Sequence, residues 1–253
     1  MKRVVLLLAI VCLATGCLWR KAEDRSYTIY RSSRIEGINL LGKETSVQGF
    51  LDDLFFEIAK RKGFQIEMRT MPNAKTQSLL EIKDADAVIG TIDLTPQNQK
   101  IFLYSEPIYS FGPVMVIRVQ DSYKSLAELK DKFVAFDRNY AGYLEGRNDV
   151  AFIFKPYDQM TLAMEDLIQG KIDAVVCDSF VAYQYVNSFY ANKIKVSTPL
   201  LKEKALRLIT YQHSKHDELI KLFNEGLNEV KAQGTYKKML NYWGLVDPST
   251  PQK

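Results

Sequence analysis

The chain has 253 residues, of which 47% are hydrophobic and 25% are charged, and its formal net charge is +4. This composition is typical of a folded globular protein of one or two domains and excludes a disordered or fibrous chain. Lys2 and Arg3 supply two of the positive charges, and the other basic residues are scattered rather than gathered in one stripe. So weak a balance argues against nucleic acid as a partner.

Residues 1–16 have the pattern of a secretory signal peptide. Two basic residues precede an apolar run over residues 4–14, and small residues then lead to Cys17. The run has about eleven residues, whereas a helix needs about 20 to cross a bilayer. The stretch that ends at Cys17 resembles the lipobox of bacterial lipoproteins, which implies lipidation of Cys17. Ala14 stands where such signals most often carry leucine, and a plain cleaved signal is the alternative.

The cysteines and histidines offer no catalytic or metal-binding pattern. Cys12 falls in the signal and Cys17 in the lipobox, so Cys177 is left alone in the folded part and neither a disulfide nor a zinc cluster is expected. His213 and His216 share one polar segment with no candidate nucleophile arranged beside them. We therefore expect no catalytic residue, no metal and no cofactor.

Strand-like and helix-like patterns alternate after a short polar segment. Residues 17–26 are mostly polar and indicate a tether between a lipid anchor and the folded part. The alternation that follows predicts an α/β protein with crossover helices. Strands are expected over residues 27–31, 64–69, 85–90, 114–119, 133–136 and 172–177. Helices are expected over residues 49–62, 76–83, 125–129, 161–169, 217–233 and 235–242.

Three segments carry a family resemblance by their order and separation. The first is GFLDDL from Gly49, and the second is DAVIGTIDLTP from Asp86, which SEPIY follows from Ser105. The third is LIQGKIDAVVCD from Leu167, with a closing QGTY and WG further along. Together they resemble the periplasmic amino-acid-binding proteins of ABC importers, which form family 3 of the bacterial extracellular solute-binding proteins.

The resemblance implies a fold of the periplasmic binding protein-like type II, an α/β architecture of two mixed-sheet lobes joined by two hinge strands. We place the crossings near residues 109–113 and 199–206. Lobe 1 is then 27–109 plus 206–248, and lobe 2 is 112–200.

The implied function is that of a substrate-binding lipoprotein, anchored by its lipid to a membrane on the periplasmic side. It captures an amino acid or a related small polar solute by lobe closure and delivers it to an ABC permease in the inner membrane. A sensory receptor of the same fold, a structural lipoprotein with a diverged cleft and a cyclic-acid dehydratase-like enzyme are the alternatives.

The resemblance also implies where the ligand lies, because open α/β sheets bind ligands beyond the carboxyl ends of their strands. Asp178 matches the carboxylate that holds the ligand's α-ammonium, although an aspartate there also suits the cap of the next helix. Gly90 and Thr91 match the loop whose backbone and hydroxyl meet the ligand, or else form a plain turn. Further matching or neighbouring positions are Asn73, Ser32, Arg34, Asn139 and Tyr140.

One departure from the family bears on the ligand's chemistry. The family's Thr-Pro-x-Arg motif supplies an arginine that clamps the ligand carboxylate, whereas this chain ends the motif with Asn98. Losing a hydrogen bond to a charged group costs roughly 1.5 to 3 kcal/mol, or about 10- to 150-fold in affinity. Asp93 adds a negative charge where the family often has a small hydroxyl, unless it merely caps the helix that follows. We therefore expect a ligand with little exposed carboxylate, such as a cationic relative of an amino acid, unless Arg34 or Arg138 replaces the clamp.

Overall fold

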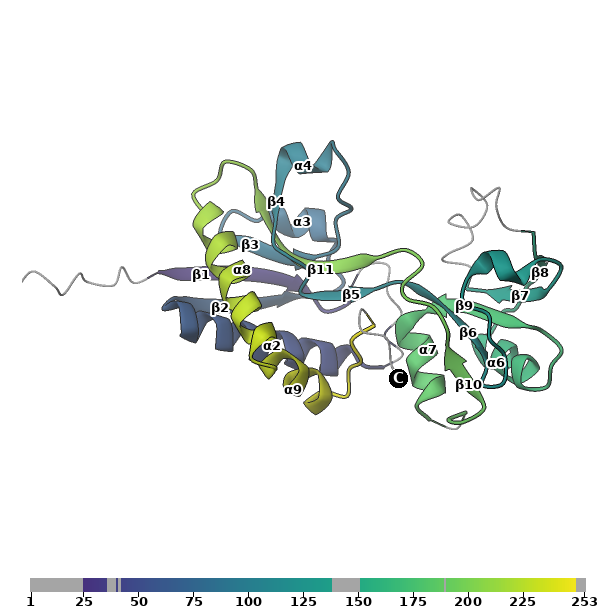
Figure 1. The fold of residues 1–253 in the computed structure, drawn as a ribbon. Coiled ribbons are helices and arrows are strands. Elements are labelled where there is room, and N and C mark those ends of the chain that lie inside the picture. Colours follow the sequence, from purple (N-terminus) through teal and green to yellow (C-terminus); the bar gives the residue numbers. More distant parts are fainter. Residues whose placement is uncertain (1–24, 36–39, 41, 138–150, 189, 249–253) are drawn as a thin grey trace, which may run out of the picture.

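The protein folds into two lobes, each built around its own sheet (Figure 1). The structure is a computed structural model, and it describes residues 25–35, 40, 42–137, 151–188 and 190–248. Both sheets are mixed, with parallel and antiparallel pairs, and helices pack against them. The prediction of an α/β protein with two mixed-sheet lobes is confirmed.

The first lobe contains a six-stranded sheet of order β2-β1-β3-β11-β4, with β5 paired to β11. Its strands are β1 (Ser26–Ser32), β2 (Gln65–Met71), β3 (Ala87–Gly90), β4 (Phe102–Tyr104), β5 (Tyr109–Phe111) and β11 (Lys204–Tyr211). β1 is parallel to β2 and β3, and β11 is antiparallel to β3, β4 and β5. Because β11 contacts all three of these strands, it holds the lobe together.

Helices cover both faces of this sheet because alternate strand residues point to opposite sides. Along β1, Ile29 packs toward α2 (Glu44–Lys62), α8 (Asp217–Ala232) and α9 (Thr235–Tyr242). Its neighbour Tyr30 packs on the other face, against α3 (Thr76–Leu80). The short α4 (Asn98–Ile101) precedes β4 on the same side as α3 (Figure 1).

The helix expected over residues 49–62 begins five residues earlier than predicted, at Glu44. The GFLDDL motif, which resembles a helix start of the family, predicts a start at Gly49. In the structure Gly49 lies inside the helix, where an added Cβ would stand 2.2 Å from Cη2 of Trp243. The glycine of the first motif thus admits the tryptophan of the closing motif, so two of the sequence signatures encode one packing contact.

The second lobe contains a five-stranded sheet of order β10-β6-β9-β7-β8. Its strands are β6 (Pro113–Arg118), β7 (Phe133–Phe136), β8 (Ile153–Lys155), β9 (Ala174–Asp178) and β10 (Ile194–Val196). The helices α6 (Met160–Ile168) and α7 (Ser179–Val186) cover one face, and the short 3-10 helix η1 (Leu126–Leu129) lies on the other. β9 is buried along its whole length, as its apolar sequence predicts.

The chain crosses between the lobes twice at one place. It passes from β5 to β6 through Gly112, and it returns along residues 197–203 to β11. β5 and β11 are paired up to Phe111 opposite Lys204. Because Gly90 lies opposite Arg207, and Asp178 opposite Pro113, the carboxyl ends of β3 and β9 both lie beside the crossing.

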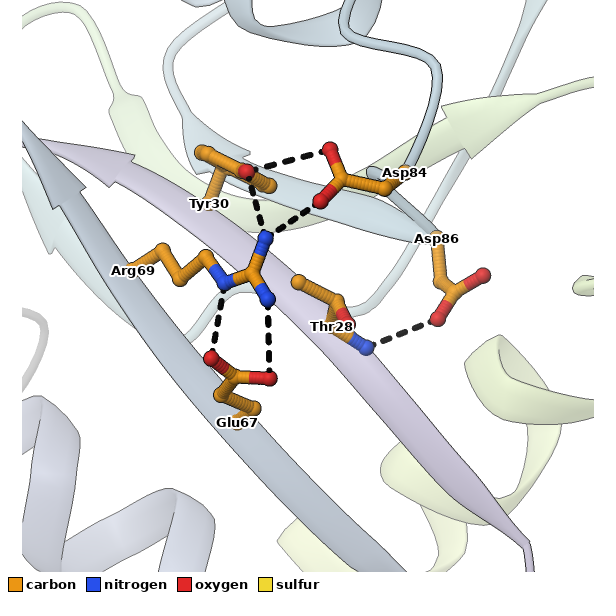
Figure 2. Close-up of polar contacts among 6 residues, drawn as sticks. All are labelled: Thr28, Tyr30, Glu67, Arg69, Asp84 and Asp86. Carbon is orange, nitrogen blue, oxygen red and sulfur yellow. Dashed lines mark hydrogen bonds and ion pairs between the residues drawn. The ribbon is translucent and has the colours of Figure 1, made fainter.

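Asp84 and Asp86, which lie just before β3, bind residues of β1 and β2 (Figure 2). Asp86 accepts a hydrogen bond from the backbone N–H of Thr28 at 2.7 Å. Asp84 accepts one from the Tyr30 hydroxyl at 3.1 Å and pairs with the guanidinium of Arg69. The Tyr30 hydroxyl, with Arg69, holds the pKa of Asp84 below its usual value. Asp86, the first residue of the DAVIGTIDLTP motif, therefore has a structural role.

Substitution of Gly112 tests how closely the two connections pack at the crossing. Its φ is 151°, and an added Cβ would lie 2.0 Å from the Lys202 carbonyl oxygen. We expect Gly112→Ala to lower the free energy of unfolding by about 3 kcal/mol, from backbone strain and this clash. Gly170→Ala is the matched control, because Gly170 has a φ of 75° but nothing within 4 Å of the added atom. Its expected loss is about 1 kcal/mol, and equal losses in urea unfolding would contradict the argument.

Candidate ligand-binding site

A small pocket lies at the carboxyl ends of β1 and β3, next to the crossing. Ser32, Arg34 and Gly90, which the sequence predicted as site residues, line it together with Gln48 and Thr76. Its volume is about 10 Å³, which holds about one water molecule. The pocket alone is therefore too small for an amino acid, and its lining on the first lobe is called the wall below.

The polar groups of this wall are held in place by hydrogen bonds. Nε2 of Gln48 donates to the carbonyl oxygen of Ser32 at 3.0 Å, and its Oε1 is buried with no hydrogen-bond partner. Arg31 is 7% exposed, pairs with Asp52 at 2.7 Å and donates to the Gln48 carbonyl oxygen. The unused Gln48 oxygen suits a ligand donor such as an ammonium group.

Gly90 is needed where it stands because Thr76 packs directly against it. An added Cβ at Gly90 would lie 2.1 Å from Cγ2 of Thr76, the first residue of α3. Sequence reasoning missed Thr76, and it missed Gln48 because the helix start was placed one residue too late to include it. A helix assigned from Glu44 would have placed Gln48 in its second turn, facing the end of β1.

Asn98 forms hydrogen bonds with residues of the loop that follows β3. The side-chain amide of Asn98 donates to the Asp93 carbonyl oxygen at 2.9 Å, and its backbone N–H donates to the Thr95 hydroxyl at 3.1 Å. Asp93 is exposed, and α4 begins at Asn98 without a side-chain cap. The Thr95 hydroxyl, and not the Asp93 carboxylate, therefore meets the start of this helix. Thr91 is partly buried directly after Gly90.

Asp178 ends β9 on the second lobe and caps α7. Its Oδ1 accepts the backbone N–H of Phe180 at 2.9 Å, and the residue is 3% exposed. The ring of Phe180 stacks on Tyr109 of β5, with centroids 5.3 Å apart, so the cap lies against the crossing. The capping alternative is thus realised. A carboxylate accepts several hydrogen bonds, so its contact with a ligand ammonium stays a prediction.

Among the other predicted positions, Asn73 is described and does not line this pocket. Asn73 is exposed, has a φ of 51°, and donates its backbone N–H to the Ser33 hydroxyl at 3.1 Å. Asn139, Tyr140 and the substitute clamp Arg138 lie outside the described residues, as does Cys17.

Reactive groups lie away from the crossing or are fully buried. Nε2 of His216 stands 3.3 Å from Asp86, at the amino end of β3, and burial lowers the pKa of this imidazole although the carboxylate opposes the shift. Cys177 is completely buried, which raises the pKa of its thiol. Within the described ranges, no three His, Cys, Asp or Glu residues are placed to hold a metal ion.

None of the helices in the described part of the chain is both long enough and apolar enough to span a bilayer.

Known proteins resemble this chain in sequence and in fold. Residues 35–246 match the family of bacterial extracellular solute-binding proteins, family 3. ABC transporter arginine-binding protein 1 of Escherichia coli is 26% identical, over 96% of this chain and 99% of that protein. Amino-acid-binding protein AabA of Dichelobacter nodosus is 24% identical, over 93% of this chain and 94% of that protein.

Among solved structures, the unliganded, open L-cystine solute receptor of Neisseria gonorrhoeae has the same fold. It superposes with a TM-score of 0.71 at 22% identity, over 90% of this chain and 97% of that chain. The family match takes in every described strand except β1, and both crossings. The chain therefore belongs to family 3 of the bacterial extracellular solute-binding proteins.

Proposed function

We propose that this protein is the amino-acid-binding component of an ABC importer and that it captures its ligand by closing the two lobes. The relatives named above include an arginine-binding protein of an ABC transporter and an amino-acid-binding protein. The observation that carries the proposal is that β3 and β9, one from each lobe, end at the same crossing. Polar groups on both sides of one hinge are the arrangement that lobe closure brings together.

Two acceptors suit the α-ammonium of an amino acid. On the first lobe, Gln48 lines the pocket with Ser32 and Gly90, and its Oε1 is buried without a hydrogen-bond partner. On the second lobe, the carboxylate of Asp178 lies at the end of β9. Closure excludes water from between them, which strengthens each charged contact. The proposal includes no chemistry on the ligand, since binding and release are sufficient for delivery to a permease.

Ligand binding is the direct test. We expect at least one of the twenty L-amino acids to bind in isothermal titration calorimetry and to raise the unfolding temperature. At a hundredfold excess over the Kd, binding stabilises the protein by about 2.7 kcal/mol. Small-angle X-ray scattering should show a smaller radius of gyration with that ligand than without it. Spermidine and a dipeptide serve as comparison ligands, and an absence of binding by all twenty amino acids would reject the proposal.

Asp178 separates a ligand contact from a structural cap. Asp178→Asn removes the charge but retains a good N-cap, so its unfolding midpoint should stay close to that of the wild type. Its affinity for the amino acid should fall by about 10- to 150-fold, because the ligand ammonium then meets a neutral amide in place of a carboxylate. Asp178→Ala is the control that also loses the cap, at a cost of about 0.5 to 2 kcal/mol. Wild-type affinity in Asp178→Asn would assign the residue to capping alone.

We further propose that residues 1–16 are a cleaved signal and that Cys17 carries lipid, with residues 17–26 as a tether in the cell envelope. The basic residues, the short apolar run and the lipobox-like sequence support this. Cys17→Ser should abolish incorporation of radiolabelled palmitate and release the protein from membrane fractions, while the purified protein still binds the amino acid. Cys12→Ser is the control and should remain labelled. Labelling of Cys17→Ser would disprove lipidation at this cysteine.

A further inference from the structure

Arg207 lies in β11, beside the end of β3 that forms the candidate site. It stands directly opposite Gly90 in the antiparallel register. Residues opposite each other in such a pair project to the same face of the sheet. An added Cβ at Gly90 would point at Thr76 of α3, so the side chain of Arg207 leaves the sheet on the α3 face.

Tyr104 lies on this same face, one strand further along. It is opposite Ile209, which is two residues after Arg207 and packs in the cluster on the α3 side. Diagonal neighbours of this kind are about 7–8 Å apart, within reach of long side chains. Gly90, Arg207 and Tyr104 therefore form a row at the carboxyl end of β3.

The guanidinium of Arg207 has N–H donors beyond the one that bonds to Ser105. One nitrogen donates to the Ser105 carbonyl oxygen at 2.6 Å, and a guanidinium has five N–H donors. It is partly buried, and it forms no ion pair with any residue of the described ranges, whereas Arg31 is already paired with Asp52. Burial lowers its pKa, yet an arginine stays charged in proteins. A ligand anion would offset the cost of this partly buried charge.

The Tyr104 hydroxyl provides a second, independent sign of a missing acceptor. It is buried and has no hydrogen-bond partner. Burial raises the pKa of Tyr104, so the hydroxyl keeps its proton and can donate it. An unpaired buried donor is destabilising, and one carboxylate could accept from both this hydroxyl and the guanidinium.

We propose that Arg207 replaces the absent clamp arginine and holds the ligand's α-carboxylate, with the Tyr104 hydroxyl as a second donor. This deepens, and rests on, the proposed amino-acid binding. The sequence-based expectation of a ligand with little exposed carboxylate rested on Asp93 and Asn98, and it considered only Arg34 and Arg138 as substitute clamps. Arg207 returns a positive charge to the site, so the ligand is an amino acid with a free α-carboxylate.

The test compares acid and amide ligands on matched variants. The probes are the tightest binder among the twenty L-amino acids and its α-carboxamide, measured by calorimetry. The wild type should prefer the acid by about 10- to 150-fold. Arg207→Gln should reduce this preference to about twofold or less. Tyr104→Phe should weaken binding of the acid by about 2- to 13-fold and leave amide binding unchanged.

Controls separate this role from loss of charge or of fold. Arg61→Gln removes a guanidinium that pairs with Glu57 on α2, at 2.6 Å, and should keep the full preference. Arg207→Lys keeps the charge without the planar fork, should keep part of the preference, and decides the test if Arg207→Gln does not fold. Arg34→Gln examines the rival arginine at the pocket and should not remove the preference.

The outcomes distinguish this inference from the proposed function. If an amino acid binds but its amide binds equally well, or if Arg34→Gln and not Arg207→Gln removes the preference, Arg207 is not the clamp while amino-acid binding stands. The same conclusion follows if the folded Arg207 variants retain the full preference. If none of the twenty amino acids binds, the proposed function fails and the assignment of Arg207 fails with it.

Discussion

The site depends on the pairing of β5 with β11 at the point where the chain leaves one lobe for the other. This pairing fixes Phe111 opposite Lys204, and the next residue, Gly112, packs against the Lys202 carbonyl oxygen in a position that no side chain fits. The two connections between the lobes therefore lie side by side. As a result, β3 and β9 end at the same place although they belong to different sheets, and a ligand there meets both lobes.

The sequence signatures mostly encode packing, and the site follows from that packing. Gly49 admits Trp243, Gly90 admits Thr76, and Asp86 binds the backbone of β1. Each contact positions a strand end or a helix start, and only a few polar groups such as Gln48 then face the site. This explains why the two-lobed α/β fold could be predicted from ordered motifs, while Gln48 and Thr76 of the pocket could not.

Local patterns predicted the long elements well and failed where tertiary contacts decide. The buried run of β9 and the amphipathic α8 are clear in the sequence, whereas the start of α2 was misplaced because a helix-interior glycine has a reason only in the folded lobe. Sequence patterns predict a crossing near residues 199–206 and no strand over residues 207–211, whereas β11 extends to Tyr211 and pairs with β3, β4 and β5. Arg207 therefore escaped notice, since only the register shows that it lies opposite Gly90.

The position of Arg207 also bears on how a ligand would favour closure. A ligand shifts a conformational equilibrium only by binding one state better than the other. The ammonium and carboxylate of an amino acid share one carbon, so Asp178 on the second lobe and Arg207 on the first can hold the same molecule only when the lobes bring them close. Arg207 lies three residues from the start of β11, where the chain enters the first lobe. A clamp on this strand would therefore couple carboxylate binding directly to the hinge, more closely than a clamp on the loop that bears Asn98.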